Sequence, residues 1–194
     1  MTSTTVFSTL FWRKFNPWRW LLLAGLLIAG VAAAEGINVK SATLEPTEET
    51  YQLSATFDVA LTQTIEDAIN RGLTLPFIIE FEVTRPRWYW WNEPIASGSR
   101  SRQLSYNVLT RQYRLTVGSL YQNFDRLEDA KQVLSSMRGI DAVERPLLHK
   151  GVTYEVALRM RLDVSRLPKP FQVNALASKE WSLPSDWYRF SFMP

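Results

Sequence analysis

The sequence predicts a mainly β domain, a two-sheet antiparallel β-sandwich that is immunoglobulin-like in the broad sense, with two short helices inserted in connections. Two observations carry this prediction. Apolar and polar residues alternate with a period of two through most of the chain after Gly36, which is typical of half-buried strands. Only two segments change to a helical period. A mixed α+β sheet with both helices on one face is the alternative.

Two strands open the domain, at 37–45 and 51–61, and the polar "PTEET" between them is a turn. The period then changes in "TIEDAINRG", where Thr64 can cap a short helix and Gly72 can end it. The next segment, "LPFIIEFEVTRPRWYW", is expected to be a strand with a solvated outer face. Its inward side chains are then Phe77, Ile79, Phe81 and Val83.

The second half of the domain follows the same pattern. "NEPIASGSRSR" is expected to be an exposed loop, and "QLSYN" and "RQYRLTV" form a hairpin joined by "NVLT". "FDRLEDAKQVLSSMRG" predicts a helix with Asp125 as its cap and Gly139 as its stop. Its apolar stripe consists of Leu127, Ala130, Leu134 and Met137. "VTYEVALRMRLDV" is the strongest strand, "VNALAS" suggests a helical turn, and "WYRFSF" closes the chain as a last strand.

The first 34 residues differ from the rest. Arg13, Lys14 and Arg19 precede the apolar run "WLLLAGLLIAGVAAA" at 20–34, which ends in small residues. A cationic start, a short apolar stretch and small residues at its end predict a secretory signal peptide over 1–34, with an uncleaved anchor as the alternative. Residues 35–194 then form a single domain. We expect it in the periplasm after Sec-type export, or anchored in the inner membrane and facing the periplasm.

Charge and composition exclude several classes of function. The chain has 22 Lys and Arg and 19 Asp and Glu, and three of the basic residues lie in the N-terminal segment, so the domain itself is neutral. A neutral exported domain is not expected to bind nucleic acid. With no cysteine and one histidine, His149 in a polar loop, it offers no ligand set for zinc or copper and no usual catalytic triad. We therefore expect no metal and no cofactor.

The segment "TRPRWYWWNEP" at 84–94 is the candidate binding site. If the strand continues unbroken, Tyr89 and Trp91 point into the core and Trp88 and Trp90 lie outside. Two interpretations remain for the outer pair: an arginine–tryptophan ladder on an edge strand, or a platform that binds a partner. The candidate partner-binding residues are Arg85, Arg87, Trp88 and Trp90, with Arg100 and Arg102 in the following loop.

Longer stretches suggest a family. "FEVTRPRWYWWNEPIASGSRSRQLSYNVLTRQYRLTVG", "TYEVALRMRLDVSRLPKPFQVNAL" and "WSLPSDWYRFSF" resemble exported bacterial proteins catalogued as domain of unknown function 4390, also labelled proline-rich signal-peptide proteins. The resemblance covers essentially the whole domain. It implies a signal sequence and one small domain, and brings no catalytic residue. Genes of such proteins often neighbour a membrane sensor kinase of the nitrogen-regulation type, so the resemblance favours a periplasmic partner.

These observations predict a non-enzymatic, exported module that binds a protein partner in the cell envelope, with a membrane sensor kinase as one candidate. We expect membrane contact only through the N-terminal segment, if that segment stays uncleaved. A module that binds glycan or another envelope polymer is the second hypothesis, since indole faces can stack on sugar rings. A hydrolase that uses two carboxylates is a third, less favoured one.

Overall fold

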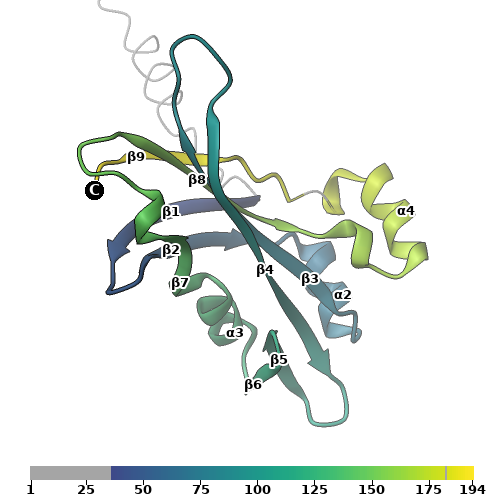
Figure 1. Cartoon of the computed structure of the whole chain (residues 1–194). Helices are drawn as coiled ribbons and strands as arrows, with labels where there is room; N and C mark the ends of the chain where they lie inside the picture. The colour runs from purple at the N-terminus through teal and green to yellow at the C-terminus, as the bar shows by residue number, and fades with distance from the viewer. Residues whose placement is uncertain (1–35, 182) are drawn as a thin grey trace, which may run out of the picture. The chain divides into compact units, whose positions relative to one another are not determined.

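The computed structural model describes residues 36–194 except Ser182, and within them nine strands form two antiparallel sheets (Figure 1). The smaller sheet has the order β1-β2-β7, with β1 at Gly36–Pro46, β2 at Thr50–Ala60 and β7 at Ser136–Glu144. The larger has the order β6-β5-β4-β3-β8-β9. Its strands are β3 at Leu75–Arg85, β4 at Glu93–Asn107, β5 at Gln112–Val117, β6 at Leu120–Phe124, β8 at Tyr154–Leu162 and β9 at Tyr188–Phe192.

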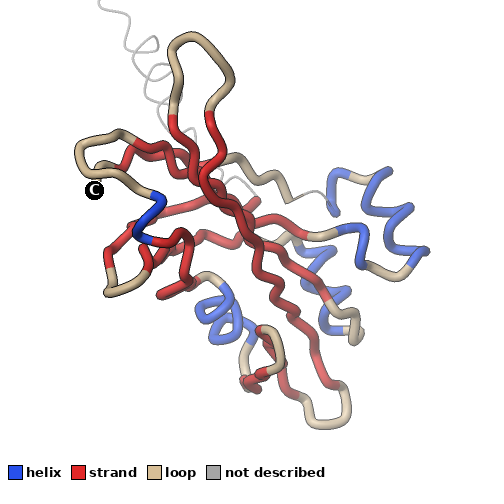
Figure 2. The backbone as a smooth tube through the Cα atoms, viewed as in Figure 1, coloured by secondary structure: helices blue, strands red, loops and turns tan. Residues whose placement is uncertain are grey.

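In the described part of the chain, three short α-helices lie in the connections and at the periphery of the sheets (Figure 2). They are α2 at Gln63–Asn70, α3 at Leu127–Leu134 and α4 at Lys169–Ala177. Single 3-10 turns occur at Arg145–Leu147 (η1), Val164–Arg166 (η2) and Lys179–Trp181 (η3). The predicted mainly β fold with two antiparallel sheets is therefore confirmed, with one helix more than expected.

Both sheets and the helices contribute to one apolar core. In β3 the odd-numbered residues from Phe77 to Val83 are buried, as predicted, and in β8 the even-numbered residues from Tyr154 to Leu162 are buried. Leu53 and Phe57 of β2 come from the smaller sheet. One face of each sheet packs on the core and the other faces solvent, so apolar and polar side chains alternate along the strands. This alternation is the period-two pattern in the sequence.

The segment that was expected to be an exposed loop, at 92–102, belongs mostly to β4. Its serines, glycine and arginines have little strand preference of their own, but the segment pairs with β3 along Leu75–Arg85, and Arg102 and the residues after it pair with β5. Gly98 is required at its position, because a Cβ atom there would lie 2.6 Å from Cζ of Phe81. Pairing with neighbours, rather than local preference, therefore makes this strand.

The second predicted helix is shorter than expected. The stripe of Leu127, Ala130 and Leu134 is buried in α3, but the chain then leaves the helix, and the buried Met137 belongs to β7. Gly139, with φ of 62°, is not a helix stop; it lies in β7 where the register with β2 shifts. Asp125 does not cap α3, whose first turn follows Arg126 without a side-chain cap. Strands β6 and β7 were not predicted.

The first predicted helix is confirmed, with its cap two residues earlier. Thr62, not Thr64, caps α2, since its side-chain oxygen accepts a hydrogen bond of 3.3 Å from the backbone N–H of Ile65. Gly72 follows the helix with φ of 91°, as its role of stop requires. The helical turn expected near "VNALAS" is part of the longer α4.

Candidate functional site

The β3–β4 hairpin carries the aromatic segment at its end. The ladder between the two strands ends at the pair Arg85–Glu93, and residues 86–92 form the connecting loop. Pro86 has no N–H and cannot extend the ladder. Neither β8 nor β5 pairs with this part of the hairpin, because β8 stops opposite Thr84 and β5 pairs only with the far half of β4. The loop therefore extends beyond the body of the larger sheet (Figure 1).

All four aromatic side chains of this loop, the aromatic tip, are exposed. The exposed fractions are 95% for Trp88, 64% for Tyr89, 69% for Trp90 and 82% for Trp91. The prediction that Tyr89 and Trp91 join the core is wrong, because the strand ends at Arg85 and its alternation does not reach the loop. The rings of Trp88 and Tyr89 make an edge contact with centroids 5.2 Å apart. Apart from this edge contact, the aromatic side chains of the tip face solvent.

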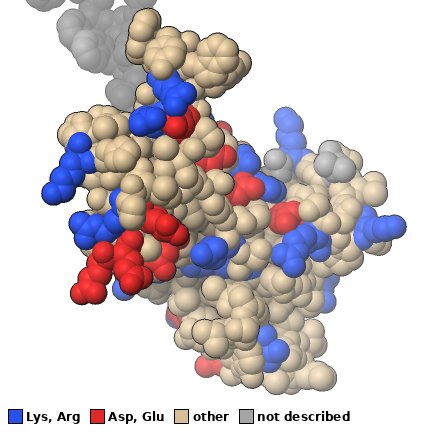
Figure 3. Space-filling model, in the orientation of Figure 1, with Lys and Arg blue, Asp and Glu red and all other residues tan. Residues whose placement is uncertain are grey.

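Two arginines stand behind the aromatic tip and share one carboxylate. Oε2 of Glu93 contacts the guanidinium of Arg85 and lies 2.6 Å from Nη2 of Arg87. These bonds, that of Arg87 first, lower the pKa of the Glu93 carboxyl below its ordinary value. In Figure 3 the end of the hairpin is uncharged, with basic and acidic side chains directly behind it. The segment Thr84–Pro94 therefore has a net charge of +1.

The arginine–tryptophan ladder, one of the two interpretations left open by the sequence, is not seen in this hairpin. Within the described residues, guanidinium groups stack on aromatic rings elsewhere, in the pairs Arg114–Tyr121, Arg145–Tyr51 and Arg159–Trp187. Arg85 and Arg87 form ion pairs with the Glu93 carboxylate instead. The indole faces of the aromatic tip are left to solvent.

Arg100 and Arg102 do not lie in a loop beside the aromatic tip. Both belong to β4, and Arg100 is seven residues beyond Glu93, about 23 Å at the usual rise of a strand. Arg102 is buried, and its Nη1 donates to the carbonyl oxygens of Leu134 at 2.6 Å and Val133 at 3.2 Å, at the end of α3. Burial lowers the pKa of the Arg102 guanidinium. Arg102 thus holds α3 against the larger sheet.

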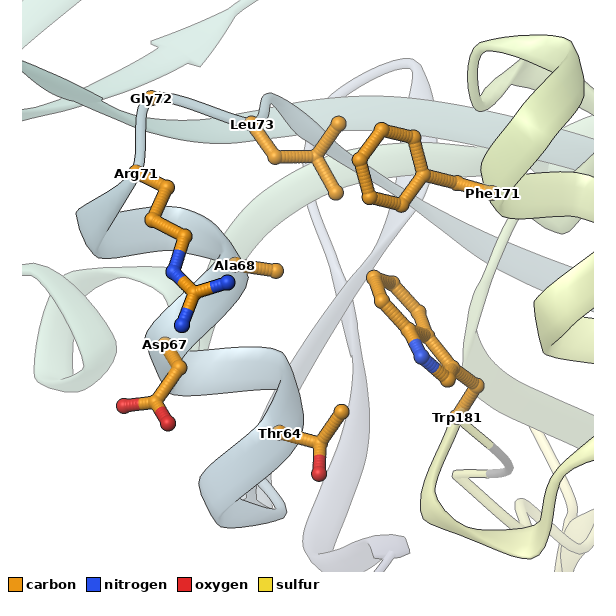
Figure 4. A pocket seen from close by; sticks show the side chains of 8 residues that line it. All are labelled: Thr64, Asp67, Ala68, Arg71, Gly72, Leu73, Phe171 and Trp181. Carbon is orange, nitrogen blue, oxygen red and sulfur yellow. The ribbon is translucent and has the colours of Figure 1, made fainter.

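A pocket of about 440 Å³ lies between α2 and the α4–η3 segment (Figure 4). Its inner wall is apolar, with the rings of Phe171 and Trp181 at 5.6 Å between centroids, and Asp67 and Arg71 stand on its rim. This pocket could not be predicted from the sequence, because Phe171 and Trp181 lie in a segment without periodicity. The full set of lining residues is Thr64, Asp67, Ala68, Arg71, Gly72, Leu73, Phe171 and Trp181.

Residues 34–191 match the model of a protein family described as a domain of unknown function (DUF4390). The chain belongs to this family. A search of the curated proteins and a search of the solved structures found no match. The match includes the β3–β4 hairpin and the pocket, so both features are part of the DUF4390 domain itself.

A second carboxylate shared by two arginines lies on the outer face of the larger sheet of this DUF4390 domain. Oε2 of Glu80 accepts from Nε of Arg159 at 2.8 Å and from Nε of Arg161 at 3.0 Å, and its Oε1 accepts from Nη2 of Arg161 at 2.9 Å. The bonds from Arg161, and then those from Arg159, hold the pKa of the Glu80 carboxyl below its ordinary value. Glu80 is therefore an ionised structural group.

Two features are absent from the described part of the DUF4390 domain. In residues 36–194 without Ser182, no three His, Cys, Asp or Glu side chains come close enough to hold a metal ion. In the same residues, no helix is both long and apolar enough to cross a membrane. The predicted signal segment at 1–34 lies outside the described residues.

Proposed function

We propose that the chain is an exported, non-enzymatic module that acts in the periplasm by binding a protein partner of the cell envelope, such as the outward-facing domain of a membrane sensor kinase. The observation that carries the proposal is the aromatic tip, four exposed aromatic residues side by side at the end of a hairpin. Soluble domains rarely expose apolar groups in such a cluster unless the cluster binds something.

The composition of the hairpin fits a binding role. Tryptophan, tyrosine and arginine supply most of the energetically dominant residues of protein interfaces, and all three types occur here. Glu93 holds both Arg85 and Arg87, so the base of the hairpin is ordered before any partner arrives. A pre-ordered base reduces the conformational entropy lost on binding.

The titratable groups give little support to the alternative of a hydrolase with two carboxylates. A general acid needs a pKa raised toward neutrality. Glu80 and Glu93 instead have lowered pKa values because arginines bond to them. The chain's histidine, His149, is exposed in the loop before β8. Binding is therefore the better-supported class of function.

The test is co-purification of envelope proteins with the full chain and with its Trp88→Ala/Trp90→Ala variant. The matched control is Leu109→Ala/Tyr121→Ala, which removes two exposed apolar side chains away from the hairpin end. We expect the first variant to lose the captured protein and the control to keep it. The free energy of unfolding of both variants should lie within about 0.5 kcal/mol of that of the parent, since exposed side chains contribute little to stability. Equal capture by all three chains would contradict the proposal.

A module that binds an envelope polymer is the second candidate, because the same exposed indole faces can stack on sugar rings. Sedimentation with peptidoglycan and lipopolysaccharide separates the two candidates. A protein-binding module should stay in the supernatant with both, whereas a glycan-binding module should sediment and lose that property in Trp88→Ala/Trp90→Ala.

A further inference from the structure

We infer that the aromatic tip docks in the headgroup region of a lipid bilayer and holds the domain against the membrane surface. The inference rests on the proposed function in one respect, since it takes the hairpin to be the docking element. It goes beyond the expectation that only the N-terminal segment touches the membrane. The partner of the hairpin end is then lipid, and a protein partner would be met at that surface.

The shape of the hairpin end favours a bilayer over a protein. The loop has seven residues and projects from the sheet (Figure 1), and all four of its aromatic side chains are exposed. A stable protein interface needs about 800 Å² on each partner, with its dominant residues in well-packed pockets. A projecting loop satisfies that only if the partner has a matching cavity. The bilayer surface is deformable and accepts a projecting group of any shape.

The residue types favour the same target. Tryptophan and tyrosine concentrate at membrane–water interfaces, where the ring lies among apolar groups and the N–H or O–H stays hydrated. Between Trp88 and Trp91 the segment has no charged side chain, and its charges stand behind the aromatic tip. With the tip inserted, Arg85 and Arg87 lie at the level of the lipid phosphates. The net charge of +1 complements these anionic groups.

The backbone limits the depth of insertion. Residues 86–92 have left the β ladder, and backbone groups without partners are not tolerated in the hydrocarbon core. The tip is therefore confined to the interfacial zone, about 5–10 Å deep. In the sequence, the apolar run at 20–34 ends directly before β1. If that run is retained as a membrane anchor, it tethers the domain close to the bilayer.

The experiment uses the absence of cysteine, which allows a single spin label to be placed in the full chain. Asn92→Cys places the label beside the aromatic tip and leaves all four aromatic residues intact, and Leu109→Cys places it in the β4–β5 loop as a control. Vesicles of phosphatidylethanolamine and phosphatidylglycerol are the probe. We expect the label at 92 to become accessible to oxygen and shielded from a water-soluble relaxation agent. The label at 109 should stay in water.

The same label is then measured in the Trp88→Ala/Trp90→Ala background. Without the two indoles that would insert into the bilayer, the fraction of labels at position 92 that is shielded from the water-soluble agent should fall by about tenfold or more. This fall is expected whether or not the N-terminal segment is retained. A label at 92 that stays in water with vesicles overturns the inference.

Photocrosslinking in cells, through a reactive residue at Trp90, separates this inference from the proposed function. A water-exposed label together with a captured protein overturns the inference and leaves the proposed function standing. A lipid-inserted label with no captured protein supports the inference and removes the protein partner.

Discussion

Replacing Arg102 by methionine should lower the free energy of unfolding by about 2 kcal/mol. Arg102 was one of six residues expected to bind a partner, yet the structure buries it and directs its Nη1 to the last carbonyls of α3. Methionine keeps most of the volume and removes the charge and the donors. The prediction therefore separates a structural role from a binding role for this arginine.

The magnitude follows from two opposing effects. A hydrogen bond from a charged group contributes about 1.5–3 kcal/mol, and removing Arg102 also leaves the buried Leu134 carbonyl without this donor. Against this, burying a guanidinium is costly, and its Nε has no partner among the described residues. Because the bond to Leu134 is short, at 2.6 Å, and lies at the negative end of a helix, we expect the stabilising effect to win by about 2 kcal/mol.

Urea unfolding followed by tryptophan fluorescence measures the difference. With a denaturant dependence of about 2 kcal/mol per molar, a loss of this size moves the midpoint down by about 1 M. Arg100→Met is the control, since Arg100 lies on the same strand but is exposed and donates to the neighbouring carbonyl of Ser99. A midpoint for Arg102→Met equal to or above that of Arg100→Met would mean that desolvation dominates and that our account of this contact is wrong.

Three further changes test other contacts. Glu80→Gln should lower the free energy of unfolding by about 1 kcal/mol at neutral pH. Because the pKa of Glu80 in the folded state is depressed below about 4.5, the stabilisation by its carboxylate is present above that pH and disappears as the pH falls through the folded pKa. The difference between the urea curves of parent and variant should therefore be smaller at pH 3 than at pH 7, and a constant difference would contradict the assignment. Thr62→Ala should lower the free energy of unfolding by about 1 kcal/mol in the same urea assay, because the cap of α2 and the hydrogen bond to the Glu180 carbonyl both disappear. Thr62→Ser should keep both hydrogen bonds and the parent's stability. Gly98→Ala should lower the melting temperature by about 4 °C or more, since its Cβ meets the buried ring of Phe81, and Phe81→Leu in that background should recover part of the loss if the clash is the cause.

The sequence was most informative where burial is one-sided. In β3 and β8 every second residue must be apolar, so the pattern from Phe77 to Val83 could be translated directly into an inner face. It was least informative in β4, whose Ser97 and Gly98 become strand only because β3 lies beside them. At the α3–β7 boundary Met137 fits both the helical stripe and the strand, so spacing alone could not locate the change.

The candidate site was located in the sequence but its geometry was not. The aromatic cluster can be recognised in the sequence, together with Arg85 and Arg87. The expected burial of Tyr89 depended on extending the alternation past Pro86, where the ladder in fact ends. The pairing of both arginines with Glu93 depends on a hairpin register that no local pattern specifies. The end of the ladder thus decided the exposure of Tyr89, and long-range pairing decided the partners of Arg85 and Arg87.

The way the hairpin is built into the sheet has a mechanical consequence. Its two strands continue without a break from the loop into the centre of the sheet, and β4 alone spans 15 residues, about 50 Å. A pull on the loop along the strands loads the ladders to β8 and β5 in shear, and their bonds, perpendicular to the strands, must yield together. The contact at the loop should therefore rupture under tension before the domain unravels.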